Sequence, residues 1–320
     1  NQQTATSAIR KLIDSDGASA ILGPTTFTLP AVMNIAQESE VPIISPTAGT
    51  SVLDDKGGEY VFRTATSDSL GGKAMARIAD NNGYDEIAVM YVDNQGGRSF
   101  GQTVIEAFET LGGTVTADVA LTPGKSSYRS ELEKAFEGDP DVVSLTAGTQ
   151  TGQIIIDQWN EQGLGGVWGL SNDMQTEGFA SNVGEPLEGS FAIGPAAAGQ
   201  QYDSFAEKYQ SKADESPQPF TPEAYDAANI AALAAQAAGS NEGADLAGEI
   251  LPVSKGGEEV EGFQAGADAL ANDADINYQG ASGPVDFTEN GNITSAFGVF
   301  QSTGSAWERA GTVEPDSLEF

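Results

Sequence analysis

Residues 20–51 read AILGPTTFTLPAVMNIAQESEVPIISPTAGTS and contain two apolar runs, at 20–22 and 41–44, on either side of a helix-like segment. Each run ends in a short loop rich in proline and threonine, GPTTFT at 23–28 and SPTAGTS at 45–51. Apolar strands that alternate with helices are typical of a parallel sheet covered by helices on both faces. The stretch therefore predicts an α/β fold in which two polar loops lie at the carboxyl ends of neighbouring strands.

The same alternation continues along the chain. Helix-like periodicity predicts helices at 2–14, 29–39, 70–82, 99–111, 127–136, 151–162, 203–212, 221–238, 244–253 and 259–272. Apolar runs predict strands at 18–22, 41–44, 60–63, 87–92, 115–121, 142–145, 167–170 and 191–194. The segment from Ile276 has period-two apolar residues with turns at Ser282-Gly283 and Asn290-Gly291, which predicts a β-hairpin. Two α/β series joined by the extended connector TATSD (64–68) indicate two lobes and a hinge.

The composition narrows the possible functions. The chain has 320 residues with 14 Lys and Arg against 47 Asp and Glu, a net charge of −33 spread along its length. Such a surface repels nucleic acid and anionic lipid, and it is typical of proteins from salt-loving archaea, although an ordinary acidic bacterial protein is the alternative. Cysteine and histidine are both absent, which excludes thiol nucleophiles, disulfides, Ser-His-Asp triads and zinc sites built on these residues. We therefore expect a non-enzymatic protein without a metal or a cofactor.

The loops at the carboxyl ends of the strands are the candidate binding loops, because open α/β sheets bind ligands there. Backbone N–H groups at a helix N-terminus, with threonine hydroxyls beside them, suit a small anion such as a carboxylate. The alternative for the first loop is that Thr25, Thr26 and Thr28 only cap the following helix. SND at 171–173 offers an amide and a carboxylate that suit an ammonium group, and a solvated Asx turn is its alternative.

Five stretches together resemble one known family and occur in that family's order. They are ILGPTTFTLPAVMNIAQESEVPIISPTAGTS, YVFRTATSD, AVMYVDNQGGRSFGQ, PEAYDAANIAALAAQAAG and YQGASGPVDFTENGN. They are similar to the extracytoplasmic solute-binding proteins of branched-chain amino acid ABC transporters. The resemblance implies the type I periplasmic-binding-protein architecture, two doubly wound (Rossmann-like) lobes that close on an amino acid. Lobe I would comprise 1–67 and 198–296, and lobe II 68–197 and 297–320.

The resemblance also implies ligand-binding positions in both lobes. In lobe I they are Thr25, Thr26 and Phe27 in the first loop, Thr47, Ala48, Gly49 and Thr50 in the second loop, and the aromatic Phe220. In lobe II they are the aromatic Phe100, the loop residues Gly148 and Thr149, and Asn172 or Asp173 as the group that binds the ammonium. Relatives usually carry threonine at the position of Gly49, and Thr50 is the adjacent hydroxyl in this chain.

By comparison with the family, the first strand, first helix and second strand of lobe I, roughly fifty residues, have no counterpart in the chain. Any export signal or lipid-anchor cysteine would lie upstream of Asn1, and no run of about 18 apolar residues predicts a membrane span.

The function that these features favour is a monomeric solute-binding protein on the extracellular face of the cytoplasmic membrane. It would bind an amino acid or similar small carboxylate and deliver it to ABC permease subunits. The alternative is a ligand-sensing domain of the same fold that regulates a partner protein.

Overall fold

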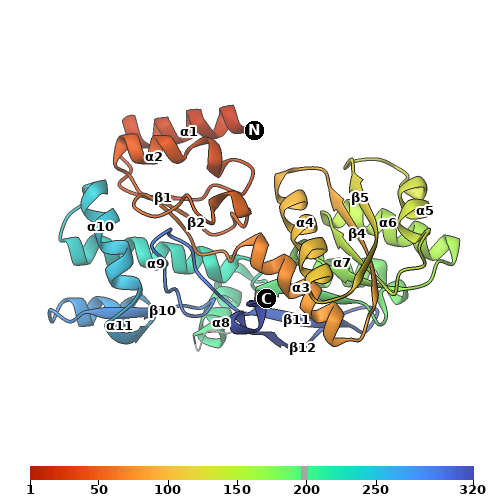
Figure 1. The fold of residues 1–320 in the computed structure, drawn as a ribbon. Coiled ribbons are helices and arrows are strands. Elements are labelled where there is room, and N and C mark those ends of the chain that lie inside the picture. The colour runs from red at the N-terminus through yellow and green to blue at the C-terminus, as the bar shows by residue number, and fades with distance from the viewer. Residues whose placement is uncertain (196–200) are drawn as a thin grey trace. The chain divides into compact units, whose positions relative to one another are not determined.

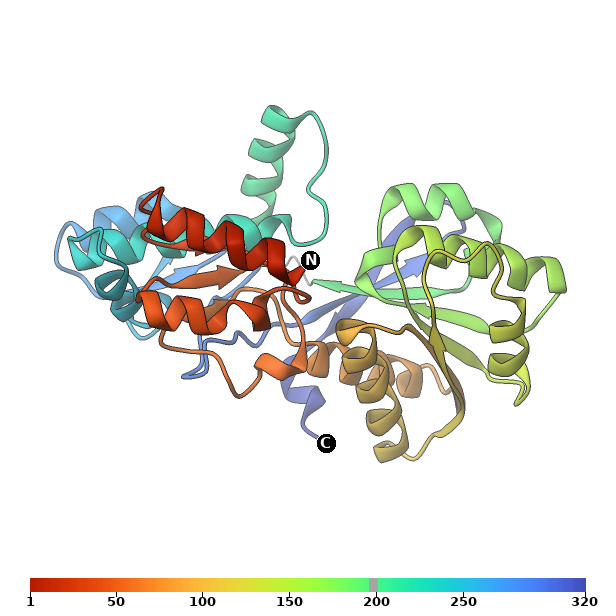
Figure 2. The same ribbon diagram turned by 90° about the horizontal axis from the view of Figure 1, so that it is seen from above.

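The computed structural model describes residues 1–195 and 201–320, and the chain divides into two compact units (Figures 1 and 2). Unit 1 comprises Asn1–Ser67 and Ala197–Ser295, and unit 2 comprises Asp68–Ala196 and Ala296–Phe320. The sequence analysis placed the return of the chain from lobe II to lobe I between residues 197 and 198, and this boundary lies outside the described residues. Both units combine parallel strands with helices on both faces of a sheet, so the predicted α/β class is confirmed.

The first sheet of unit 1 has three parallel strands in the order β1-β2-β3. The strands are β1 (Ile21–Leu22), β2 (Ile43–Ser45) and β3 (Val61–Arg63), and the helices around them are α1 (Gln2–Asp14), α2 (Met33–Ser39), α9 (Thr221–Ala238) and α10 (Gly243–Ser254). A further helix, α8 (Tyr202–Ala213), contacts α9 through the rings of Phe205 and Tyr225. Because strand side chains alternate between faces, Ile43 packs in a core with α1 and α2, whereas Ile44 packs in a core with α9 and α10. The predicted helix at 29–39 is a short 3₁₀ turn, Leu29–Ala31, followed by α2.

Unit 1 also has a second, two-stranded sheet that the sequence did not predict. Strands β9 (Glu258–Glu261) and β10 (Ile276–Gln279) pair in parallel around α11 (Gly262–Leu270). The helix expected at 259–272 is therefore wrong in its first turn. The turn expected at Ser282-Gly283 is present and is closed by one antiparallel bridge between Gln279 and Pro284, but its flanks do not extend into a pair of strands. The strand β9 was missed because only one of its four residues, Val260, is buried. Val260 packs with Tyr278 in the core that also contains residues of α9.

Unit 2 contains a seven-stranded sheet in the order β12-β11-β8-β7-β6-β4-β5. Its strands are β4 (Glu86–Val92), β5 (Thr114–Leu121), β6 (Val142–Thr146), β7 (Val167–Leu170), β8 (Phe191–Pro195), β11 (Phe297–Ser302) and β12 (Trp307–Val313). Its helices are α3 (Asp68–Asn81), α4 (Gln95–Thr110), α5 (Arg129–Phe136), α6 (Thr149–Gln162) and α7 (Glu177–Val183). The strands from β4 to β8 are parallel, and β11 and β12 form an antiparallel hairpin that the sequence analysis missed.

The sheet of unit 2 separates two hydrophobic cores. Helices α3 and α4 cover one face, and α5, α6 and α7 cover the other (Figure 1). Trp168 on β7 is fully buried on the α5–α7 side, where its ring meets Trp159 edge-on at 5.7 Å. None of the helices within the described residues is long and apolar enough to cross a bilayer.

The stretches AYDA and QGAS, which carried part of the family resemblance, are joined by one buried carboxylate. Asp226 on α9 accepts hydrogen bonds from Tyr278 Oη (2.8 Å), Ala281 N (2.9 Å), Ser282 N (2.8 Å) and Ser282 Oγ (2.6 Å). Gly280 lies directly against it, and a Cβ at this position would be 2.4 Å from Asp226 Oδ2. These motif residues therefore hold the turn after β10 onto α9.

This close approach predicts that Gly280→Ala destabilises the protein by roughly 2–3 kcal/mol, because either the turn or the buried carboxylate must move. Gly248→Ala on the exposed side of α10 is the matched control, since a Cβ there meets nothing within 4 Å. Alanine within a helix should stabilise that control by up to about 1 kcal/mol. Denaturant unfolding measures both changes, and equal effects in the two variants would contradict the assignment.

Candidate functional site

Ser45, at the carboxyl end of β2, ties together the two threonine-rich loops of unit 1. Its side chain is fully buried, and its hydroxyl donates to Pro24 O at 2.5 Å. The same oxygen accepts from Ala48 N at 3.1 Å and from Thr47 N at 3.4 Å. The loops that follow β1 and β2 therefore share one anchoring hydroxyl, as neighbouring parallel strands allow.

Thr26 makes a second link between the same loops. Its hydroxyl accepts from Gly49 N at 2.9 Å and donates to Thr47 O at 3.4 Å. The structure thus brings together Thr26, Thr47 and Gly49, three of the positions implied by the resemblance. The Gly49 N–H, however, already has an acceptor within the protein.

The first loop offers backbone donors that nothing in the described part of the chain uses. The loop makes a helical turn, in which Leu29 N donates to Thr25 O at 2.9 Å. No hydrogen bond within the described residues uses the N–H groups of Thr25, Thr26 and Phe27, which precede that turn. Thr25 is exposed, as is Phe27, whose side chain is 52% exposed. Three consecutive free N–H groups at the surface are an arrangement that binds anions.

Two other positions of the second loop are structural in unit 1. Thr50 is fully buried, and its hydroxyl accepts from Val52 N at 3.4 Å as the N-cap of the turn Ser51–Leu53. Ala48 is likewise fully buried and packs in the core beside α1 and α2. The backbone groups of Ala48 and the hydroxyl of Thr50, which the resemblance implied as ligand contacts, are therefore already hydrogen-bonded within unit 1.

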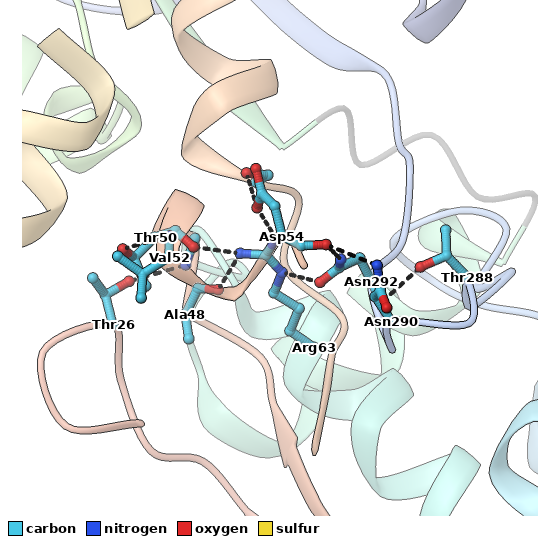
Figure 3. Close-up of polar contacts among 11 residues, drawn as sticks. Thr26, Ala48, Thr50, Val52, Asp54, Arg63, Thr288, Asn290 and Asn292 are labelled. Carbon is cyan, nitrogen blue, oxygen red and sulfur yellow. Dashed lines mark hydrogen bonds and ion pairs between the residues drawn. The ribbon is translucent and has the colours of Figure 1, made fainter. Parts of the chain in front are cut away.

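Arg63, at the end of β3, holds the second loop from the inside (Figure 3). Its side chain is only 2% exposed, and Nη1 donates to Ala48 O at 3.2 Å and to Thr50 O at 2.9 Å. Its Nη2 forms an ion pair with Asp54, and Nε donates to Asn292 Oδ1 at 2.7 Å. Sequence analysis placed Arg63 in a strand without a role, although an arginine at a buried strand end was a signal that it has a buried partner.

Asp54 in turn joins this arginine to two segments next to the unit boundaries. It accepts from Ser67 Oγ at 2.7 Å, and its backbone oxygen accepts from Asn292 Nδ2 at 2.8 Å (Figure 3). Ser67 is the last residue of the first segment of unit 1, and Asn292 lies near the end of its second segment. The loop 46–54 is therefore fixed to both of these segments.

A buried acid lies at the same edge of unit 1, in the first turn of α9. Glu223 is 4% exposed, and its Oε2 has no hydrogen-bond partner within the described residues. Its backbone oxygen accepts from Thr64 Oγ1 at 2.9 Å, and Thr64 N donates to Ser45 O at 3.0 Å. Burial, with a smaller contribution from Asp226, raises the pKa of Glu223 to about 8. Sequence analysis missed this acid because the chain is acidic throughout.

Phe220 precedes α9 as its N-cap, in a left-handed conformation with φ of 67°. Its side chain is half-buried, so it stays a candidate ligand contact.

In unit 2 the predicted site residues fall into two groups, because Phe100 is buried in a core whereas the others follow the ends of two strands. Phe100 is 6% exposed and packs in the core with α3, where a Cβ on Gly71 would lie 3.0 Å from its ring. The expectation that Phe100 forms an aromatic wall for a ligand is therefore corrected. Its place in a hydrophobic core follows from the apolar stripe of α4, which also buries Val104 and Phe108.

The other predicted positions of unit 2 lie where the sequence placed them, at the carboxyl ends of β6 and β7. Gly148 is the N-cap of α6 and Thr149 its first residue, and both are exposed. Asn172 and Asp173 form a 3₁₀ turn directly after β7, where Asn172 is half-buried and Asp173 is exposed.

Two further hydroxyls at these strand ends were missed. Leu145 pairs in register with Leu170, so Thr146 and Ser171 are the next residues of neighbouring strands. The side-chain oxygens of both are buried and have no partner within the described residues. A buried polar atom without a partner costs about 1–3 kcal/mol. These hydroxyls are therefore candidate ligand contacts, and their position at the strand ends was the signal that could have found them.

The Arg63 contacts predict a large effect of substitution there. Arg63→Met keeps much of the volume but removes the cation that pairs with Asp54 and the donor of two loop carbonyls, so we expect roughly 3–5 kcal/mol of destabilisation. Arg63→Lys should restore only part of it, because one ammonium cannot replace the guanidinium fork. Arg129→Met is the control, since Arg129 and its partner Glu161 are 48% and 61% exposed and should contribute under about 1 kcal/mol. Equal unfolding free energies of Arg63→Met and wild type would refute the anchoring role.

The raised pKa of Glu223 predicts a pH dependence of stability. Between its ordinary value of 4.5 and about 8, the unfolded chain has lost this proton and the folded chain keeps it. The free energy of unfolding should therefore fall as pH rises through this range, by up to about 1.4 kcal/mol per pH unit relative to Glu223→Gln. Denaturant titrations of both proteins from pH 5 to pH 8 measure this difference. Parallel pH profiles would show that the carboxyl is already ionised in the folded state.

Known proteins resemble this chain over most of its length. The chemotactic signal transduction system substrate-binding protein BasB of Halobacterium salinarum is 28% identical over 283 residues, which are 84% of this chain and 66% of BasB. Glutamate receptor 2.8 of Arabidopsis thaliana is 26% identical over 53% of this chain and 18% of the receptor. The chain thus spans less than two thirds of the length of these curated relatives.

Solved structures share the fold. The leucine-binding protein LivK from Thermotoga maritima has a TM-score of 0.83 and 24% identity, covering 99% of this chain and 85% of that one. A solute-binding protein from R. palustris in complex with benzoate has a TM-score of 0.80 and 17% identity, covering 98% and 83%. LivJ from Streptococcus pneumoniae in complex with isoleucine has a TM-score of 0.79 and 18% identity, covering 98% and 84%. The profile of the family described as periplasmic binding protein matches residues 1–306, and the chain therefore belongs to this family and has its type I fold.

Proposed function

We propose that this protein binds a small ligand bearing a carboxylate, an amino acid foremost, and delivers it to the permease of an ABC importer. It performs no reaction on the ligand, and it works on the extracellular face of the cytoplasmic membrane. The observation that carries the proposal is the set of free N–H groups of Thr25, Thr26 and Phe27 on a loop fixed by Ser45. Oriented N–H groups at a helix start stabilise a carboxylate without any cation from the protein.

The proposed contacts in unit 1 are the groups that remain accessible. They are the Thr25–Phe27 backbone, the Thr26 and Thr47 side chains beside it, and Phe220 at the start of α9. In unit 2 the proposed contacts are Gly148, Thr149, Asn172 and Asp173.

Sensing is the second candidate function, and the likeness to BasB favours it, because BasB is named as a substrate-binding protein of a chemotactic signal transduction system. The same site serves either function, so ligand chemistry does not discriminate between them. Cross-linking of the tagged protein in the cells that express it discriminates: capture of an ABC permease supports transport, and capture of a membrane transducer supports sensing.

A ligand screen in molar potassium chloride tests the proposal, since high salt screens the −33 charge of the chain. The panel holds the twenty L-amino acids, 4-methylpentanoate and benzoate, and the readouts are the unfolding midpoint and calorimetric affinity. We expect at least one member to raise the midpoint and Thr26→Val to weaken its binding about tenfold, because the hydroxyl that orders the second loop is lost. Thr110→Val, whose hydroxyl bonds only within its own helix, should bind as wild type does. No response to any member of the panel would refute the function.

A further inference from the structure

Glu223 lies at the end of the core-facing stripe of α9. Ala227 and Ile230, one and two turns further along the helix, pack in the same core as Ile44 on β2 and Phe62 on β3. Because residues at i, i+4 and i+7 share one helix face, the side chain of Glu223 continues this stripe toward the carboxyl ends of those strands. The hydrogen bonds from Thr64 to Glu223 O and to Ser45 O fix this placement. Glu223 is therefore at the same edge of the sheet as the two threonine-rich loops.

The Glu223 carboxyl differs from the other buried acid on its helix. Asp226, one turn later, receives four hydrogen bonds, whereas Oε2 of the 4% exposed Glu223 receives none within the described residues. The nearby cation Arg63 is fully committed to Ala48, Thr50, Asp54 and Asn292. One carboxyl oxygen of Glu223 is thus buried without a partner in the described part of the chain, and such an atom is costly unless a group from outside the chain pairs with it.

We propose that Glu223 binds the ammonium group of the ligand, so that unit 1 alone recognises both ends of an amino acid. The inference rests on the proposed function and specifies its ligand: the free N–H groups of Thr25–Phe27 bind the carboxylate, and Glu223 binds the positive charge. A charge-assisted hydrogen bond to a desolvated carboxylate is among the stronger polar contacts available to a small ligand. The ligand class is thereby an amino acid, in preference to a carboxylate that lacks an ammonium group.

The protonation state of Glu223 provides a second measurement of its contact with the ligand, the release of a proton on binding. Burial raises its pKa to about 8, so the ligand-free protein carries a proton there at pH 7. Two other titratable groups interact with it: Asp226 on the same helix, and Tyr202 on α8, whose own pKa is raised by burial, by Asp203 and by Glu223. An ammonium favours the ionised carboxylate, so binding an amino acid should release this proton and tighten as pH rises from 6 to 8. The chain has no histidine or cysteine, so few other groups titrate in this range.

The experiment compares L-leucine with 4-methylpentanoate, which has the same carboxylate and side chain but no ammonium, and repeats the comparison for each amino acid that the ligand screen identifies. Calorimetry in two buffers of different ionisation enthalpy at pH 7 gives the affinity and the number of protons released. For the wild type we expect preference for the amino acid by at least about tenfold and release of nearly one proton. Glu223→Gln should weaken amino acid binding by roughly 10- to 100-fold, leave the des-amino analogue within about threefold, and release no proton.

Glu207→Gln on the exposed surface of α8 removes the same charge and should bind as wild type does. If an amino acid binds while Glu223→Gln keeps its affinity, or if the des-amino analogue or benzoate binds as tightly as the amino acid, the role of Glu223 is overturned and the solute-binding function stands. If no compound binds, both are overturned. Should Glu223→Gln fail to fold, the wild type decides alone, because amino acid binding without proton release excludes Glu223 as the partner.

Discussion

The candidate site depends on the burial of polar anchors beneath two loops at the carboxyl edge of a small sheet. The Ser45 hydroxyl hydrogen-bonds to both loops, and the buried Arg63 side chain donates hydrogen bonds to the carbonyl oxygens of Ala48 and Thr50. In a trans peptide the carbonyl and the following N–H point in opposite directions. Carbonyls drawn inward to Arg63 therefore turn the next N–H groups away from it, and Thr26 accepts one of them, that of Gly49. The anchors thus order the second loop against the first, whose N–H groups at Thr25, Thr26 and Phe27 have no acceptor within the described residues.

Because the chain has few cations, the position of each one indicates which part of the structure it stabilises. Only 14 Lys and Arg residues accompany 47 acids, and Arg63 is deeply buried where it orders a loop. A buried arginine so used cannot also bind a ligand carboxylate, which explains why backbone N–H groups are the available anion donors. Because cations are scarce, the buried acids at this edge of unit 1 depend on hydrogen-bond donors instead. Asp226 accepts hydrogen bonds from a turn, whereas Oε2 of Glu223 has no partner within the described residues.

The sequence was sufficient for the features that local periodicity encodes. It predicted the parallel strands, most helices and the two loops of unit 1, because apolar runs and helix periods report burial directly. It was insufficient where tertiary contacts decide. Residues 258–261 form a strand only because β10 pairs beside them, and the strands of the terminal hairpin were missed because Trp307–Val313 is mostly exposed and lacks an apolar alternation. A side chain chosen by resemblance failed for the same reason: Phe100 occupies a core position that α3 creates.

The comparison with solved structures separates what the fold determines from what side chains determine. Proteins in complex with isoleucine and with benzoate share this fold at TM-scores of 0.79 and 0.80, so the architecture accommodates carboxylates with and without an ammonium group. Backbone N–H groups at a loop bind either kind of carboxylate and do not discriminate between them. To prefer an amino acid over a carboxylate without an ammonium group, the protein needs a buried group that only the ammonium can pair with. When the other ligand binds, this group stays unpaired, and the cost of leaving it unpaired creates the selectivity. Glu223 has these properties in unit 1: it is buried, its Oε2 has no partner within the described residues, and it lies at the edge of the sheet where the two threonine-rich loops lie.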